Sequence, residues 1–354
     1  MRIGQEFKQE KFDLGDMQID TCDKYTYLGD VITPDGKNTE NINSRKTKLK
    51  STSISINTIA SSEVLHRIET PVLLELHERI NIPSLISNSE SWSLLKSEEK
   101  EVEQAEIQCL KSMFNLPLKT PTPSIIFTFG TLFTTIRIDQ KRLLYLHKIL
   151  NRDPTHWTKR SFHTLETLKI GWYKGIIKTL EEYEIQTDLD QIKRYNPTEW
   201  RSIVQKAVEK RNKTKLIDDC HKKIDGILTP KTKTAHIIPT LNEPNYTRKP
   251  VEVLNHLSKK EAKTLVIARY GMLECGRNFK GTMSELCGNC HCIDDEEHRL
   301  NICPLYSNVN YHDCPVKTKF ETIFSEDIDT IRLILTRIAT VWNTGTGQGM
   351  INST

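Results

Sequence analysis

The sequence has no apolar run long enough to cross a membrane. Its longest run, SIIFTFGTLFTTI at residues 124–136, is far short of the roughly 20 residues that a spanning helix needs. The first ten residues, MRIGQEFKQE, are polar and lack the apolar stretch of a secretory signal. We therefore expect an intracellular protein without membrane contact, nuclear or cytoplasmic, in which disulfide bonds are disfavoured.

The sequence also has little net charge. Its 50 basic and 46 acidic residues leave a formal charge of +4, which is too small to indicate a nucleic-acid partner by itself. The charge is unevenly distributed, however. Between Lys206 and Lys233, nine lysines and arginines stand against four acidic residues.

Several catalytic motifs are missing. The chain contains no G-x-S-x-G, H-E-x-x-H or G-x-x-x-x-G-K-[ST]. A two-metal polymerase needs aspartates to hold its ions, including an adjacent pair on a hairpin. The pairs Asp218-Asp219 and Asp294-Asp295 fall on a predicted helix and in a cysteine-rich loop, so we interpret them as solvated charges. We expect no enzymatic activity from this chain alone.

Cysteine, in contrast, is concentrated in one short segment. The stretch CGNCHCIDDEEHRLNIC, residues 287–303, contains four of the nine cysteines. The spacing C-x2-C-x7-H-x4-C is typical of a closed, tetrahedral and therefore structural zinc site. Its ligands would be Cys287, Cys290, His298 and Cys303. Two alternatives remain open: Cys292 could replace Cys290, or His291 could compete as a ligand.

Hydrophobic periodicity predicts a mainly α fold with a short β element in front. Alternating runs in the first forty residues predict two or three strands, with turns at Gly15-Asp16 and Pro34-Asp35-Gly36. From residue 38 the period is helical, with Ile42, Leu49 and Ile56 facing a core. The basic residues of this first helix are expected on its solvent side: Arg45, Lys46, Lys48 and Lys50.

Further helices follow along the chain. They are predicted over residues 71–86, 98–116, 136–150, 197–223, 257–272 and 327–342. Asn196-Pro197-Thr198-Glu199 is a strong helix start, with an N-cap, a proline at the first position and a glutamate three residues on. We predict that Cys109 packs in a helical core as a small hydrophobic residue. The proline-containing segment 226–250 is expected to be an extended linker.

The order of these predicted elements and motifs resembles that of a known family. The segment KYTYLGDVITPDGKNTENINSRKTK is similar to the region that follows the polymerase palm in non-LTR (LINE-type) retrotransposon reverse transcriptases. The cysteine segment, with ARYGMLECGRNFKG before it, resembles the zinc-binding segment at the C-terminal end of that family. Two departures are Lys46, where the family usually has an apolar residue, and the additional Cys292.

The resemblance implies a division of the chain into five segments. These are the end of the palm with the primer-grip strands (1–37), a helical thumb-like region (38–176), a helical basic linker region (177–255), a zinc-binding segment (256–310) and a C-terminal helix with a flexible tail (311–354). The catalytic palm would precede residue 1. The intact polyprotein would then be an RNA-directed DNA polymerase, of which this chain would be a part that binds nucleic acid.

The resemblance also implies which residues contact RNA or DNA. They are Tyr27, Leu28 and Gly29 in a primer-grip turn, Arg45 and Lys48 on the first helix, and Arg269, Arg277 and Lys280 around the zinc segment. Phosphate contacts of lysine and arginine would make the binding salt-sensitive. The alternative is a zinc-stabilised helical module for protein interaction, which the acidic residues 294–297 favour because they would repel phosphate.

Overall fold

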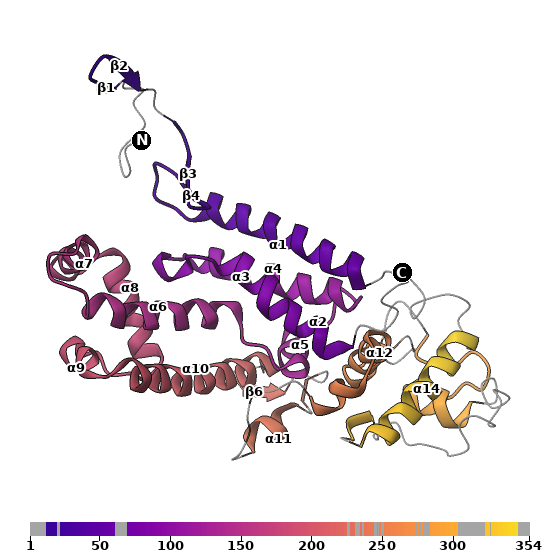
Figure 1. Ribbon diagram of the computed structural model, residues 1–354. Coiled ribbons are helices and arrows are strands. Elements are labelled where there is room, and N and C mark those ends of the chain that lie inside the picture. The colour runs from indigo at the N-terminus through magenta and orange to yellow at the C-terminus, as the bar shows by residue number, and fades with distance from the viewer. Residues whose placement is uncertain are drawn as a thin grey trace. The chain divides into compact units, whose positions relative to one another are not determined.

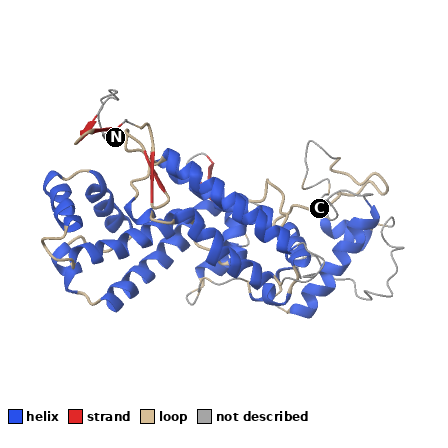
Figure 2. Cartoon of the chain, turned by 45° about the horizontal axis from the view of Figure 1, so that its top comes forward, coloured by secondary structure: helices blue, strands red, loops and turns tan. Residues whose placement is uncertain are grey.

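The computed structural model describes residues 12–19, 22–60, 69–224, 227–230, 234–235, 237–243, 246, 248, 251–273, 275, 278, 284–303, 323–325 and 327–345. Helices dominate this part of the chain, as Figure 2 shows in blue, and the prediction of a mainly α fold is confirmed. Across these ranges, no helix combines the length and the apolar character that crossing a membrane would require.

The elements are numerous and range in length from three residues to 24. The strands are β1 (Phe12–Leu14), β2 (Met17–Ile19), β3 (Tyr25–Tyr27), β4 (Asp30–Ile32), β5 (His221–Ile224) and β6 (Ile227–Pro230). The first helices are α1 (Thr39–Ala60), α2 (Thr70–Leu76), η2 (His77–Asn81), α3 (Ile82–Ile86), η3 (Ser89–Ser91), α4 (Lys96–Met113), α5 (Thr122–Phe129), α6 (Thr134–Leu150) and α7 (Trp157–Leu168). The later ones are α8 (Gly171–Glu182), α9 (Leu189–Arg194), α10 (Pro197–Cys220), α11 (Ile237–Asn242), η4 (Glu252–His256), α12 (Lys259–Arg269), η5 (His298–Ile302) and α14 (Ile328–Gly345).

The chain divides into two compact units, each built from separated segments. Unit 1 comprises Met1–Ile54, Glu78–Glu106 and Leu132–Thr214. Unit 2 comprises Ser55–His77, Ile107–Thr131 and Lys215–Thr354. The division into five functional segments stays a prediction.

Two antiparallel hairpins begin unit 1. In the first, β1 pairs with β2 around a turn at Gly15-Asp16, as predicted. In the second, β3 pairs with β4 around a turn at Leu28-Gly29. The predicted turn at Pro34-Asp35-Gly36 is also present, directly after β4, where the Gly36 N–H donates a 3.1 Å hydrogen bond to the Thr33 carbonyl. Leu28 and Gly29 have φ angles of 48° and 86°. Positive φ at both central residues marks the type I′ turn, whose twist matches that of the paired strands.

Helix α1 follows the second hairpin (Figure 1). Ile42, Leu49 and Ile56 are 1%, 2% and 3% exposed, so the repeat of seven residues predicted the buried face correctly. Lys48 and Lys50 are exposed, whereas Arg45 is buried. The expectation that the basic residues of this helix all face solvent is therefore wrong for Arg45.

Helix α6 lies at the centre of the unit 1 core, in contact with η3, α7, α8 and α9. Its Leu143 and Leu146 are fully buried. Trp200 of α10 packs into the same core, and its indole Nε1 donates a 2.9 Å hydrogen bond to the Leu143 carbonyl. The predicted cap of α10 is present, because Asn196 Oδ1 accepts from the backbone N–H groups of Thr198 and Glu199.

Unit 2 is organised around α12 and α14, which pack against each other. Ser258 and Glu261 form a capping box at the start of α12. After this helix, the buried Tyr270 hydroxyl lies 2.6 Å from Thr128 Oγ1. Both predicted helices are thus confirmed, and α14 buries an apolar face made of Ile331, Ile334, Leu335 and Ile338.

The structure differs from prediction after α10. The helix ends at Cys220 and not at Lys223, and β5 and β6 form a hairpin. The prediction of an extended linker over residues 226–250 is wrong, because this segment also contains α11. The dipeptide Asp225-Gly226 between the two strands is a sequence signal for a hairpin that periodicity alone overlooks.

Candidate metal centre and predicted nucleic-acid contacts

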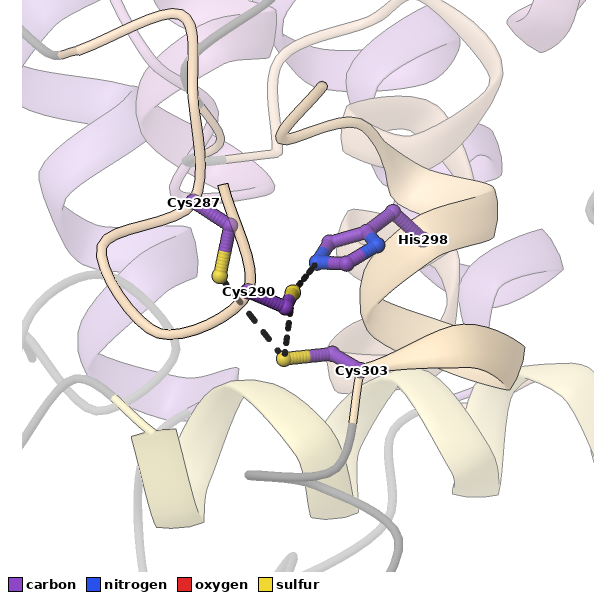
Figure 3. A group of neighbouring side chains, drawn as sticks. All are labelled: Cys287, Cys290, His298 and Cys303. Atoms are coloured by element: carbon purple, nitrogen blue, oxygen red, sulfur yellow. Dashed lines mark hydrogen bonds between the residues drawn. The ribbon is translucent and has the colours of Figure 1, made fainter. Parts of the chain in front are cut away.

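A tight hairpin brings the first two candidate ligands together. Leu286 and Ile293 form an antiparallel bridge, and the Cys287 N–H donates to the Cys292 carbonyl at 2.8 Å. The His291 N–H donates back to the Cys287 carbonyl at 2.9 Å. The chain therefore reverses within Cys287–His291, and the Cys287 and Cys290 thiols lie on one side of the turn (Figure 3).

A single helical turn supplies the other two ligands. His298 begins η5 and Cys303 follows its last residue, with the Cys303 N–H donating to the His298 carbonyl at 2.8 Å. Asp295 Oδ1 accepts a 2.9 Å hydrogen bond from the His298 N–H, and so caps this turn. The four-residue gap between His298 and Cys303 thus places both side chains toward the hairpin thiols (Figure 3).

The four ligand atoms form a compact cluster. All lie within 4.8 Å of one another. Cys303 Sγ is 3.7 Å from Cys287 Sγ and 3.9 Å from Cys290 Sγ, and His298 Nε2 is 3.1 Å from Cys290 Sγ. A tetrahedral ion with bonds of about 2.3 Å to sulfur separates its sulfur ligands by about 3.8 Å. The spacing of the cluster therefore fits a tetrahedral metal ion such as zinc.

The cluster also settles the alternative ligands. Cys292 and His291 are exposed and do not belong to the cluster. His291 adopts a φ of 55°, which the reversal of the hairpin requires. With Cys287, Cys290, His298 and Cys303 together, the protein itself provides all the ligands of a four-coordinate site. Such a closed site stabilises structure and leaves no position for a reacting water.

The electrostatics of the turn favour a thiolate at Cys287. Burial by itself raises the pKa of this thiol, but hydrogen bonds from the N–H groups of Asn289 and Cys290 and from the side chains of His298 and Cys290 together bring the pKa down to about 6. Burial raises the pKa of Cys290 to about 12, and its hydrogen bond with Cys287 acts in the same direction. A preformed thiolate is the species that binds a divalent ion, which then displaces the remaining protons.

Buried polar contacts connect the cluster to α14. Arg299, next to His298, makes two 2.7 Å hydrogen bonds to the carboxylate of Asp294, and both side chains are 8% exposed. The Arg299 guanidinium lies 5.6 Å from the ring centroid of Trp342. From α14, Arg337 donates two hydrogen bonds to the Leu300 carbonyl. The cluster of candidate ligands is therefore part of the unit 2 core.

These contacts correct the interpretation of the acidic segment. Asp294 is buried and paired with Arg299, and Asp295 caps η5, so this pair is not simply a solvated charge. Glu296 is also buried and accepts a hydrogen bond from Asn278. The argument that residues 294–297 repel phosphate loses force, because two of the four carboxylates do not face solvent.

The predicted primer-grip turn is exposed. Tyr27 and Leu28 are 58% and 81% exposed, and Gly29 occupies the second position of the turn. Tyr25, two residues before Tyr27 and on the same face of β3, is also exposed. Side chains at this turn are therefore accessible to a partner.

Arg45 lies beneath this turn and is 4% exposed. Its guanidinium donates a 2.6 Å hydrogen bond to Asp30 Oδ1, directly after Gly29. Asn41 donates to the same oxygen, and Asn88 donates to Asp30 Oδ2. Arg45 thus positions the hairpin. The partners Asp30 and Asn88 were not predicted, because polar residues brought together from separate segments leave no periodic signal.

The remaining residues predicted to contact nucleic acid differ in their exposure. Lys48 is exposed on α1. Arg269 is 8% exposed, and its guanidinium donates to the carbonyls of Ile323 and Ser325. These contacts give Arg269 a role in packing the segment before α14 onto α12. Arg277 and Lys280 lie outside the described residues.

Comparisons of the chain with protein-family models, curated proteins and solved structures give no match.

Proposed function

We propose that this chain binds single-stranded or primer–template nucleic acid. In this proposal it corresponds to the region that follows the palm of a non-LTR retrotransposon reverse transcriptase, with the polymerase domain supplied elsewhere in the polyprotein. Zinc at Cys287, Cys290, His298 and Cys303 would hold the C-terminal element in shape and take no part in a reaction.

One observation supports this proposal above the others. The Tyr27-Leu28-Gly29 turn and Arg45, which the family resemblance identifies at two places of one segment, are joined through Asp30. Together they form an exposed turn that carries aromatic side chains and is held by a partly buried ion pair. Tyrosines on a fixed support can stack on unpaired bases, and such stacking contributes about 1–3 kcal/mol per base.

The test is salt-dependent binding of a fluorescent single-stranded RNA to the purified chain. We expect binding at low salt that weakens toward physiological salt. Replacing Tyr27 by alanine should weaken binding about tenfold or more. Lys48→Gln should reduce the slope of log K against log salt by about 0.7, which is one phosphate contact on a single strand.

A matched control is Lys178→Gln. Lys178 is also an exposed lysine of unit 1, but it pairs with Glu182 on α8 and lies outside the predicted contacts. This variant should bind as the unmodified chain does. If RNA and a primer–template duplex both fail to bind at low salt while the zinc content is complete, the proposal is wrong.

A second candidate function is protein interaction. It is favoured by large apolar side chains at the surface of unit 1, of which Trp157, Leu168 and Ile170 are 72%, 58% and 50% exposed. Exposed apolar groups mark a contact surface where they are contiguous. The RNA experiment separates the two candidates, because protein interaction predicts no salt-sensitive RNA binding.

A further inference from the structure

A second cluster of soft ligands lies in unit 2, apart from the zinc ligands in the sequence. His77 ends α2 and begins the π-helix η2, while Cys109 and Met113 are one helical turn apart on α4. All three side chains are buried, at 1%, 6% and 0% exposure. We propose that His77, Cys109 and Met113 form a site for one Cu(I) ion.

The contact between His77 and Cys109 carries the proposal. Cys109 Sγ lies 3.9 Å from His77 Nδ1, and the two residues belong to different helices. Cys109 Sγ is also 3.9 Å from Met113 Sδ. The second contact follows from helical geometry, which brings residues i and i+4 together in any helix. The contact between Cys109 and His77 does not follow from helical geometry, since it depends on the position in which η2 holds His77.

The distances suit a three-coordinate ion. A trigonal ion with bonds of about 2.3 Å separates its ligand atoms by about 4 Å. Both observed distances agree with that value. The π-helix at His77–Asn81 is a further indication, because such single-turn irregularities often occur at functional sites.

The ligand types select the ion. A thioether is a soft, neutral donor that suits Cu(I) and is a poor ligand for magnesium or calcium. Cysteine thiolate is also soft, and imidazole binds copper well. With one thiolate, the site would neutralise the single positive charge of Cu(I), and a buried neutral complex avoids the cost of an uncompensated charge.

The experiment is an anaerobic Cu(I) titration of the full chain, already loaded with zinc, against a chromogenic Cu(I) chelator. We expect one equivalent of Cu(I) to bind and to raise the melting temperature. Met113→Leu nearly preserves volume, so it should fold normally while losing at least tenfold in Cu(I) affinity. Cys109→Ser should lose the site. Met272→Leu is the matched control, since Met272 is another buried methionine of unit 2 and should leave binding unchanged.

Zinc content measured in the same samples distinguishes this site from the zinc cluster. Loss of Cu(I) binding in Met113→Leu with full zinc content supports the proposal. Equal Cu(I) binding by Met113→Leu and the unmodified chain overturns it, as does Cu(I) uptake that occurs only when zinc is displaced.

Discussion

The β3–β4 hairpin and the hairpin bridged by Leu286 and Ile293 are both short, and both expose large apolar side chains. They are held by different means. At the first, Asp30 pairs with the buried Arg45 of α1. At the second, four candidate metal ligands converge within 4.8 Å. Segments with too few apolar residues to form a core can thus be fixed by a partly buried ion pair or, in the zinc proposal, by a metal ion.

The two solutions differ in how strongly they should affect stability. A metal bound only by the folded state contributes its whole binding free energy to folding, about 10–16 kcal/mol for structural zinc. A buried ion pair gains far less, because desolvation offsets most of the attraction between the charges. Changes at the metal cluster should therefore exceed changes at Asp30 and Arg45.

The largest effect should follow loss of a metal ligand. In Cys303→Ser we expect loss of zinc and of protection from hydrogen exchange in residues 284–303 and α14, because Arg337 and Trp342 of α14 contact Leu300 and Arg299 of η5. Residues 25–32 should keep their protection. Zinc analysis measures the metal content, and hydrogen exchange measures the protection of each segment. Cys292→Ser, which removes an exposed thiol, is the control. Full zinc content in Cys303→Ser would contradict the assigned ligands.

The next effect concerns the support of the metal cluster. Arg299→Met leaves the Asp294 carboxylate buried without its partner, and should lower the free energy of unfolding by about 3–5 kcal/mol. Urea unfolding followed by tryptophan fluorescence measures this change. Arg332→Met on the exposed side of α14 is the control and should cost less than about 1 kcal/mol. Equal effects of the two variants would show that the Asp294–Arg299 pair is not structural.

The corresponding change at the first hairpin should be smaller. Arg45→Met should lower the free energy of unfolding by about 2 kcal/mol, below the usual cost of breaking a buried pair, because the Asp30 side chain is 23% exposed. Lys46→Met removes the partly exposed pair with Glu101 and should cost less than about 1 kcal/mol. Denaturant unfolding compares the two. A loss for Arg45→Met no larger than that for Lys46→Met would mean that the Asp30 pair does not hold the hairpin.

The two regions were not equally predictable from the sequence. The candidate metal ligands follow one another at short gaps, so Cys287, Cys290, His298 and Cys303 were predicted from spacing, although Cys292 and His291 stayed open as alternatives until the structure showed them exposed. The helices could also be predicted, since Ile42, Leu49 and Ile56 repeat along one face. The partners of Arg45 could not, because Asp30 and Asn88 come from distant segments and only the folded chain brings them to it.

Charge was the least predictable property. Arg269 and Arg45 were expected to meet nucleic acid, and Asp294 was expected to be solvated, yet all three are buried. A sequence pattern predicts whether a charged residue lies on a helix or in a loop. Whether that residue is buried depends on an ion pair or a hydrogen bond with a group from another segment. Asp294 meets Arg299, and Arg269 meets the carbonyls of Ile323 and Ser325.

The smallest effect compares one glycine from each hairpin turn. Gly29 has a φ of 86° and an added Cβ would meet only Arg45 Nη2 at 3.8 Å, so Gly29→Ala is strained by the backbone and not by crowding. It should cost about 1 kcal/mol. An added Cβ at Gly288 would meet nothing within 4 Å, and Gly288 is not among the residues with positive φ. Gly288→Ala should therefore be nearly neutral and keep its zinc. Thermal unfolding of both variants measures the difference, and a larger loss for Gly288→Ala would mean that the metal-binding turn needs a conformational freedom that its backbone angles do not indicate.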